Sequence, residues 1–111
     1  MAITEGFLEY IVEQLRGAGT VTTRKMFGGA GVYIDGIITG LVADDILYLK
    51  VDDGNRGDFE SQGMAPFQPF EDKPYSMSYY EVPPEVLEDP EELCMWAARS
   101  IEASLRSKSR K

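Results

Sequence analysis

The sequence predicts an α+β fold in two layers, with an antiparallel sheet of about five strands flanked by helices from the two ends of the chain. Three observations predict it: apolar residues at helical spacing near the N-terminus, short β-branched and aromatic runs separated by turn dipeptides in the middle, and a long helical pattern opened by "DPEE". The expected order is one helix, three or four strands, a short helix, two strands and a last helix. A chain of 111 residues has room for one such domain.

We expect the first helix over residues 3–17. Thr4 is placed to cap its start, and Gly17 and Gly19 are placed to end it. Apolar residues recur on one face at the helical period: Phe7, Leu8, Ile11, Val12 and Leu15.

The next part of the chain reads as an antiparallel meander. Its strands are "VTTRKMF", "GVYI", "IITGLVA" and "ILYLKVD". Asp35-Gly36 predicts a hairpin with a type I′ turn, and Asp44-Asp45 marks the next return. In the last of these strands Leu47, Leu49 and Val51 alternate with more polar residues, so one face of the sheet is expected to be buried.

The second half predicts a shorter set of elements. Residues 54–62 form a short helix or turn anchored by Phe59, "APFQPF" is an extended edge segment, and "PYSMSYYEVP" is the final strand. The last helix has Asp89 as N-cap, Pro90 at its first position and Glu92 placed to complete a capping box. Its inward stripe is expected to be Leu93, Trp96, Ala97, Ser100, Ile101 and Leu105.

The charge is strongly negative and unevenly distributed. The net charge is −8, while residues 106–111 hold four cations and no acid. We expect one domain over residues 1–105, and a basic tail over 106–111 that frays at the end of the last helix, where cations suit the helix dipole. An acidic body of this kind disfavours direct binding to DNA.

The residue inventory argues against a catalytic site. The chain has no His and one Cys, which excludes a zinc site, and Cys94 is expected to be a buried helical residue. Asp44-Asp45 and Asp52-Asp53 are expected to be turn residues rather than magnesium ligands. With no secretory signal in "MAITEGFLEY" and no disulfide framework, we expect a cytoplasmic protein with no cofactor.

The glycine-rich stretch "RKMFGGAGVYIDG" lacks the order of a phosphate-binding motif. Lys25 precedes the glycines, unlike the Walker loop, and Ile34 stands where a dinucleotide fingerprint has its third glycine. We expect Gly28, Gly29 and Gly31 to permit a bulge or a tight crossing of strands. Arg24 and Lys25 are expected to lie on opposite faces of their strand.

The same stretch carries a family resemblance. Together with "LVADDILYLKVDDGNRGDFESQG", "MSYYEVP" and "LCMWAARS", it resembles the N-terminal domain of the TfoX/Sxy regulators over about Thr22 to Ser104. The resemblance implies a two-layer α+β fold like those of secretion chaperones and YjbR-type domains. It also implies a bacterial regulator of competence genes that acts with the cyclic-AMP receptor protein, and no catalytic residues. The helical C-terminal domain of longer family members is not part of this sequence.

These observations favour a non-enzymatic cytoplasmic regulatory or adaptor domain that works by protein contact, with a transcription factor or polymerase-associated partner implied by the resemblance. The candidate interaction residues are Arg24, Lys25, Phe27, Gly28, Gly29, Tyr33, Tyr79 and Tyr80. Adjacent tyrosines in a strand point to opposite faces, so one of the last two is expected in the core.

Two other functions stay open. One is a small-molecule or phosphate-ligand binding domain that uses the Gly28–Gly31 loop with Arg24 or Lys25. The other is an aspartate–metal enzyme, which predicts stabilisation by divalent ions that is lost on Asp52→Asn. A homodimer paired through helices or sheet edges is also open, although the prolines of "PFQPF" argue against that strand as the seam.

Overall fold

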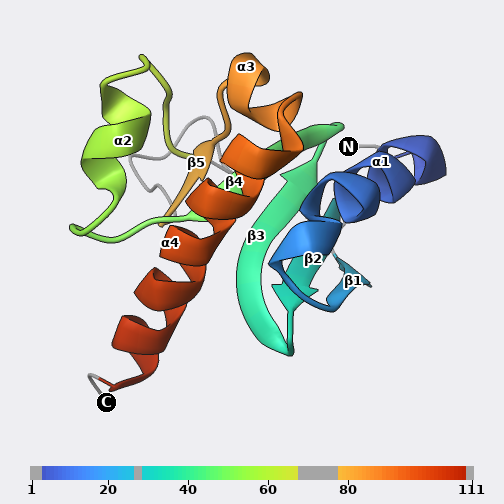
Figure 1. Ribbon diagram of the computed structural model, residues 1–111, viewed down its shortest axis with the longest axis horizontal. Helices are drawn as coiled ribbons and strands as arrows, with labels where there is room; N and C mark the ends of the chain where they lie inside the picture. The colour runs from blue at the N-terminus through green and yellow to red at the C-terminus, as the bar shows by residue number, and fades with distance from the viewer. Residues whose placement is uncertain (1–3, 27–28, 68–77, 110–111) are drawn as a thin grey trace.

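The computed structural model describes residues 4–26, 29–67 and 78–109, and it has the predicted α+β architecture (Figure 1). The sheet has five strands in the order β1-β2-β3-β4-β5, and each is antiparallel to its neighbours. The strands are β1 (Val21–Met26), β2 (Gly29–Ile34), β3 (Ile37–Ala43), β4 (Ile46–Lys50) and β5 (Tyr79–Glu81). The helices are α1 (Glu5–Leu15), α2 (Arg56–Glu60), α3 (Pro84–Leu87) and α4 (Pro90–Ser109).

Both predicted hairpin turns are confirmed by their backbone angles. Asp35 and Gly36 have φ of 52° and 81°, and Asp44 and Asp45 have φ of 52° and 57°. Positive φ at both central residues is the property of type I′ turns, whose twist matches that of the flanking strands. The Asp45 carboxylate also accepts hydrogen bonds from the backbone N–H and the hydroxyl of Thr4, so the second turn fixes the start of α1.

The bulge lies in a different strand from the one expected. Val32 pairs with Gly40 and Tyr33 pairs with Ile38, which leaves Thr39 of β3 as the extra residue. Its side chain is buried, and its hydroxyl donates to the carbonyl of Ile37 at 3.0 Å. The bulge lies beside a contact between β3 and α4, where the Ser104 hydroxyl donates to the Ile38 carbonyl at 2.5 Å. The glycines of β2 do not indicate this contact in the sequence.

The helix ends follow the predicted caps with two changes. The Thr4 hydroxyl accepts from the Phe7 N–H, and α1 then ends at Leu15 in a short 3₁₀ turn. Asp89 caps α4 by accepting from the N–H groups of the second and third helical residues. The predicted capping box is only half formed, because the Asp89 N–H donates to the Val86 carbonyl. That carbonyl belongs to α3, a short helix that the sequence reading missed and that Pro84 opens.

The core lies between one face of the sheet and the layer of α1 and α4 (Figure 1). α4 contacts β3 and β4, while α1 contacts β1 and α4. The stripe expected on α4 is correct except at Leu105, which is 45% exposed; Ala103 and Ser104 are buried instead. The buried apolar residues include Leu8, Ile11, Leu15, Ala30, Val32, Ile34, Val42, Leu47, Leu49, Phe59, Leu93 and Ala97. Among the described residues, no helix is both long enough and apolar enough to cross a membrane.

The two edges of the sheet differ. Residues 65–67 lie along the outer side of β5, where the Phe67 N–H donates to Tyr79 and the Ala65 carbonyl accepts from Glu81. These residues belong to the extended edge segment "APFQPF" that the prolines predicted. The last three residues of that segment and the first four of "PYSMSYYEVP" lie outside the described residues. Within the described ranges, β1 has β2 as its one strand partner. In the sheet that the described residues form, β1 is therefore the open edge.

Candidate functional site

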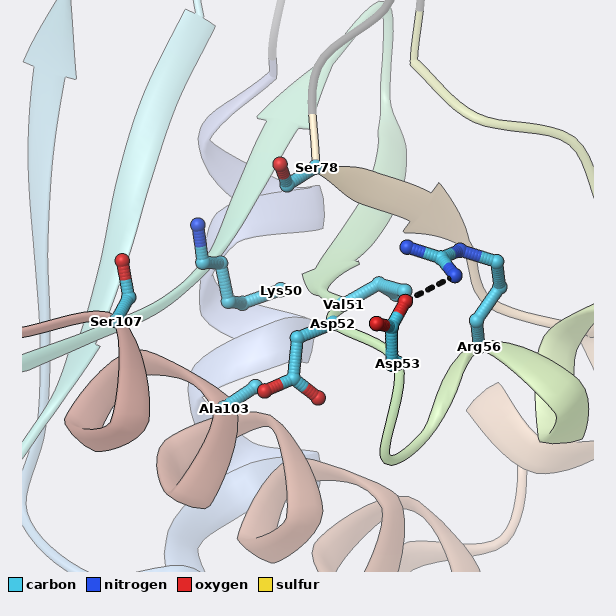
Figure 2. A pocket seen from close by; sticks show the side chains of 8 residues that line it. All are labelled: Lys50, Val51, Asp52, Asp53, Arg56, Ser78, Ala103 and Ser107. Atoms are coloured by element: carbon cyan, nitrogen blue, oxygen red, sulfur yellow. Dashed lines mark hydrogen bonds and ion pairs between the residues drawn. The ribbon is translucent and has the colours of Figure 1, made fainter. Parts of the chain in front are cut away.

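Two adjoining hollows meet at Lys50, where the last turns of α4 pass the ends of β3 and β4. The first, of about 210 Å³, is drawn in Figure 2 and is lined by Lys50, Asp52, Asp53, Arg56, Ser78 and Ser107 among others. The second, of about 370 Å³, is lined by Tyr33, Gly36, Ile37, Ile38, Lys50, Ser104 and Ser107. We call the two together the Lys50 hollow.

Lys50 is placed by the alternation of β4. Its neighbours Leu49 and Val51 are buried in the core, so the lysine side chain leaves the opposite face of the strand. It pairs across the sheet with Tyr79, and its ammonium lies 5.2 Å from the centroid of the Tyr79 ring. This distance is suitable for a cation–π interaction.

The turn after β4 is held by a buried amide. Asn55 is buried, its Nδ2 donates to the Lys50 carbonyl at 3.0 Å, and its Oδ1 accepts from the Asp52 N–H at 2.9 Å. The Asp52 carboxylate also accepts from the Gly54 N–H at 2.8 Å. These bonds satisfy backbone groups at the strand end and fix the turn that carries Asp52 and Asp53.

The two aspartates of this turn are both paired with arginines. Arg106 of α4 donates Nε and Nη2 to Asp52 at 2.6 and 2.7 Å, and Arg56 donates to Asp53 at 2.5 Å. These hydrogen bonds are the first cause of a raised pKa at both arginines. Across the residues that the structure describes, no group of three or more acidic, His or Cys side chains is arranged to hold a metal ion.

The adjacent tyrosines split between the faces as predicted. Tyr79, 9% exposed, lies beside Lys50; burial raises the pKa of its hydroxyl, and the neighbouring Tyr33 raises it further. Tyr80 packs on the core side against Phe59, with ring centroids 5.9 Å apart, and its hydroxyl donates to Glu60. Of the predicted site residues, Tyr33 thus lines the Lys50 hollow, and Tyr79 lies near it through its contact with Lys50.

The predicted cations lie elsewhere, on β1. Lys25 reaches toward α1, where its ammonium lies 3.4 Å from Glu5. Arg24 is exposed and, by the alternation of the strand, belongs to the other face, as predicted. Neither residue lines the Lys50 hollow.

Within the glycine-rich stretch, Gly29 has a structural role. A Cβ on Gly29 would lie 2.4 Å from the Val42 carbonyl oxygen of β3, so this close crossing requires glycine. The crossing confirms the expectation for Gly29. Phe27 and Gly28 lie outside the described residues.

Cys94 is half-buried, and its thiol donates to the Gln14 carbonyl at 3.6 Å. Burial raises the pKa of the thiol, which keeps it protonated and weakly nucleophilic. The helical position agrees with the sequence prediction, but Cys94 is half-buried rather than buried.

The sequence reading missed the centre of the Lys50 hollow. Lys50 occupies a polar-face position in a strand and directly precedes Val51 and the two aspartates, which is the one local signal available. Ser107 lies on α4, and Ser78 directly precedes β5. Both are far from Lys50 in the sequence, so no local pattern predicts that the three residues line one hollow. Their meeting depends on the tertiary fold.

Comparison with known protein families gives one match. The family model of the TfoX N-terminal domain matches residues 13–104, which is most of the chain. No curated protein matches at a significant level. With this match and the α+β fold described above, the chain belongs to the TfoX N-terminal domain family.

Proposed function

We propose that this chain is a non-enzymatic regulatory domain of the cytoplasm that acts as an adaptor through protein contacts in transcription regulation. Its membership in the TfoX N-terminal domain family supports a competence-regulator-like role. Its acidic character also supports contact with a protein rather than with a nucleic acid backbone.

The observation that carries the proposal is the open edge formed by β1. An edge strand presents unpaired N–H and C=O groups that can accept an added strand from a partner. Thr22, Thr23, Arg24 and Lys25 are all exposed along this edge. The two cations favour an extended partner segment with acidic residues, and they discourage edge-to-edge pairing of two copies because like charges repel.

Affinity capture from the cytosol of the source organism tests the proposal, with any captured protein then purified and rebound. The informative variant is Arg24→Glu, which reverses one charge at the edge. Arg16→Glu is a matched control with the same charge change, because Arg16 is also exposed and lies outside the sheet. Circular dichroism establishes that both variants fold.

We expect a transcription factor or polymerase-associated protein that binds the wild type and Arg16→Glu but loses most of its affinity for Arg24→Glu. The edge proposal is wrong if purified partner binds all three proteins equally. The adaptor proposal itself is wrong if the wild type retains no protein at low salt, where electrostatic contacts are strongest.

The two alternative functions have less support. Gly29 is explained by the strand crossing, which removes one reason to assign the Gly28–Gly31 loop to a phosphate ligand. For the aspartate–metal enzyme, both oxygens of Asp52 already accept hydrogen bonds from Arg106. We therefore assign Asp52 a structural role in the proposal.

A further inference from the structure

Among the residues that the structure describes, the ammonium of Lys50 has an aromatic partner and no carboxylate partner. Among the described residues, the ion pairs join other cations, and the contact of Lys50 is with the face of Tyr79. Lys50 is half-buried, so water solvates its charge only in part. Over the described ranges this half-buried lysine has no counter-ion, although the protein carries a net charge of −8.

The acids nearest to Lys50 in the sequence are engaged elsewhere. Asp52 is held by Arg106 and Asp53 by Arg56, so each carboxylate has its own cation. Figure 2 shows the Lys50 side chain extending away from both carboxylates, on the side where Ser78 and Ser107 place their hydroxyls. The open side of the ammonium therefore faces hydroxyl groups, which can donate hydrogen bonds to an anion.

The second part of the hollow adds an apolar wall. Tyr33, Ile37 and Ile38 line it together with Lys50 and Ser107, and this lining contains no acidic residue. Its volume of about 370 Å³ lies within the range of small-molecule sites. A cation and hydroxyls beside an apolar wall fit a ligand with an anionic group and a compact apolar body.

We propose that the Lys50 hollow binds a small organic anion, with its phosphate or carboxylate group at Lys50 and Ser107 and its apolar body against Tyr33, Ile37 and Ile38. This site is separate from the β1 edge, so it goes beyond the adaptor function and does not depend on it. Binding of an anion there supplies a counter-ion that no described residue provides to Lys50.

Titration of the full chain, followed by ¹H–¹⁵N NMR, tests the proposal. The probes are phenyl phosphate and benzoate, which share a ring and differ in the anionic group, and phenol is the neutral control. We expect saturable shifts at Lys50, Ser107, Tyr33 and Ile38 with at least one anion, and much smaller shifts with phenol. The anion that binds with the higher affinity shows whether the site prefers a phosphate or a carboxylate group.

Two variants locate the binding. Lys50→Gln is expected to weaken binding of the anion by about tenfold or more, because a hydrogen bond from a charged donor is lost. Ser107→Ala, on the exposed side of a helix, is expected to weaken it less and provides a second reading if Lys50→Gln fails to fold. Lys25→Gln is the matched control, with the same change of residue on β1, and is expected to bind as the wild type does.

The proposal is overturned if neither anion gives saturable shifts or if phenol binds as tightly as the anions. It is also overturned if Lys50→Gln and Ser107→Ala both bind the anion as strongly as the wild type does. Shifts confined to the neighbourhood of Arg24 and Lys25 would also overturn it and would instead favour an anion site beside the glycine-rich stretch.

Discussion

Arg106, near the end of α4, binds Asp52, just after β4, through two hydrogen bonds of 2.6 and 2.7 Å across 54 residues of sequence. This fork-like geometry is the strongest form of ion pair that arginine makes. A Cβ on Gly54 would lie 2.6 Å from the Arg106 Nη2, so a larger residue in this turn would require the guanidinium group to shift. The pair joins the helical layer to the strand end that positions Lys50.

Replacing Asp52 by Ala is expected to lower the melting temperature by roughly 5 °C, because the substitution removes the acceptor of both Arg106 and the Gly54 N–H. The matched control is Asp53→Ala, since the Asp53 side chain is 86% exposed. The control is expected to melt close to the wild type, because exposed ion pairs contribute little. Thermal unfolding by circular dichroism measures both, and equal shifts in the two variants would contradict the structural role of Asp52.

A Gly40→Ala substitution is expected to destabilise the sheet by about 2 kcal/mol or more, because the added Cβ would lie 2.4 Å from the Tyr48 carbonyl oxygen of β4. Backbone atoms of a paired strand cannot move away without loss of hydrogen bonds. Gly57→Ala is the control, since its Cβ meets nothing within 4 Å on α2, and it is expected to stabilise the domain by up to about 1 kcal/mol. Urea unfolding distinguishes them, and a tolerated Gly40→Ala would mean that β3 and β4 are further apart than described.

Much of the fold was predictable because its signals are local. The Asp35-Gly36 turn, the alternation of Leu47 and Leu49, and the cap at Asp89 each depend on a few neighbouring residues. Such patterns fix the type of each element before any tertiary contact forms. The order of the strands and the positions of α1, α2 and α4 followed directly from them, whereas α3 did not.

The parts that sequence reasoning missed depend on distant contacts. Thr39 becomes the bulged residue where Ser104 of α4 meets the neighbouring carbonyl, and no pattern within β3 signals this. The Lys50 hollow likewise needs Ser107 from α4 beside the end of β4. The candidate site could therefore be predicted only in part, through Tyr33 and Tyr79, and its central lysine required the fold.

Phe59 is expected to be the most costly side chain of α2 to remove. It is 1% exposed, and its ring meets Trp96 edge-to-face with centroids 4.8 Å apart. Truncation to Ala is expected to cost about 3–5 kcal/mol, a large part of the stability of a domain of this size. Phe59→Leu is expected to cost much less because it retains most of the volume.

The chain has one tryptophan, so Trp96 fluorescence reports on this cluster directly. Urea unfolding followed by fluorescence measures the Phe59 variants, and Phe7→Leu on the half-buried side of α1 provides the matched control. A cost for Phe59→Leu no larger than that for Phe7→Leu, with unchanged native fluorescence, would contradict the packing described for α2.

Stability is expected to fall as the solution becomes alkaline. Burial raises the pKa of the Cys94 thiol above its ordinary 9.0 and the pKa of Tyr48 and Tyr79 above their ordinary 10.0. In the window between the ordinary and the raised values, the unfolded chain binds fewer protons than the native protein does. The free energy of unfolding therefore decreases with pH in that window, and below the ordinary values these groups add no slope.

Tyr79→Phe isolates the contribution of the tyrosine beside Lys50. The variant cannot ionise at this position, so its unfolding free energy is expected to decline less steeply than that of the wild type above about pH 10. Near neutral pH both proteins carry an uncharged ring here, and their stabilities are expected to change in parallel with pH. Urea unfolding at a series of pH values measures the two slopes. A steeper alkaline decline in Tyr79→Phe would mean that the native state favours the phenolate, and Lys50 would then act as its counter-ion rather than as a cation open to an external anion.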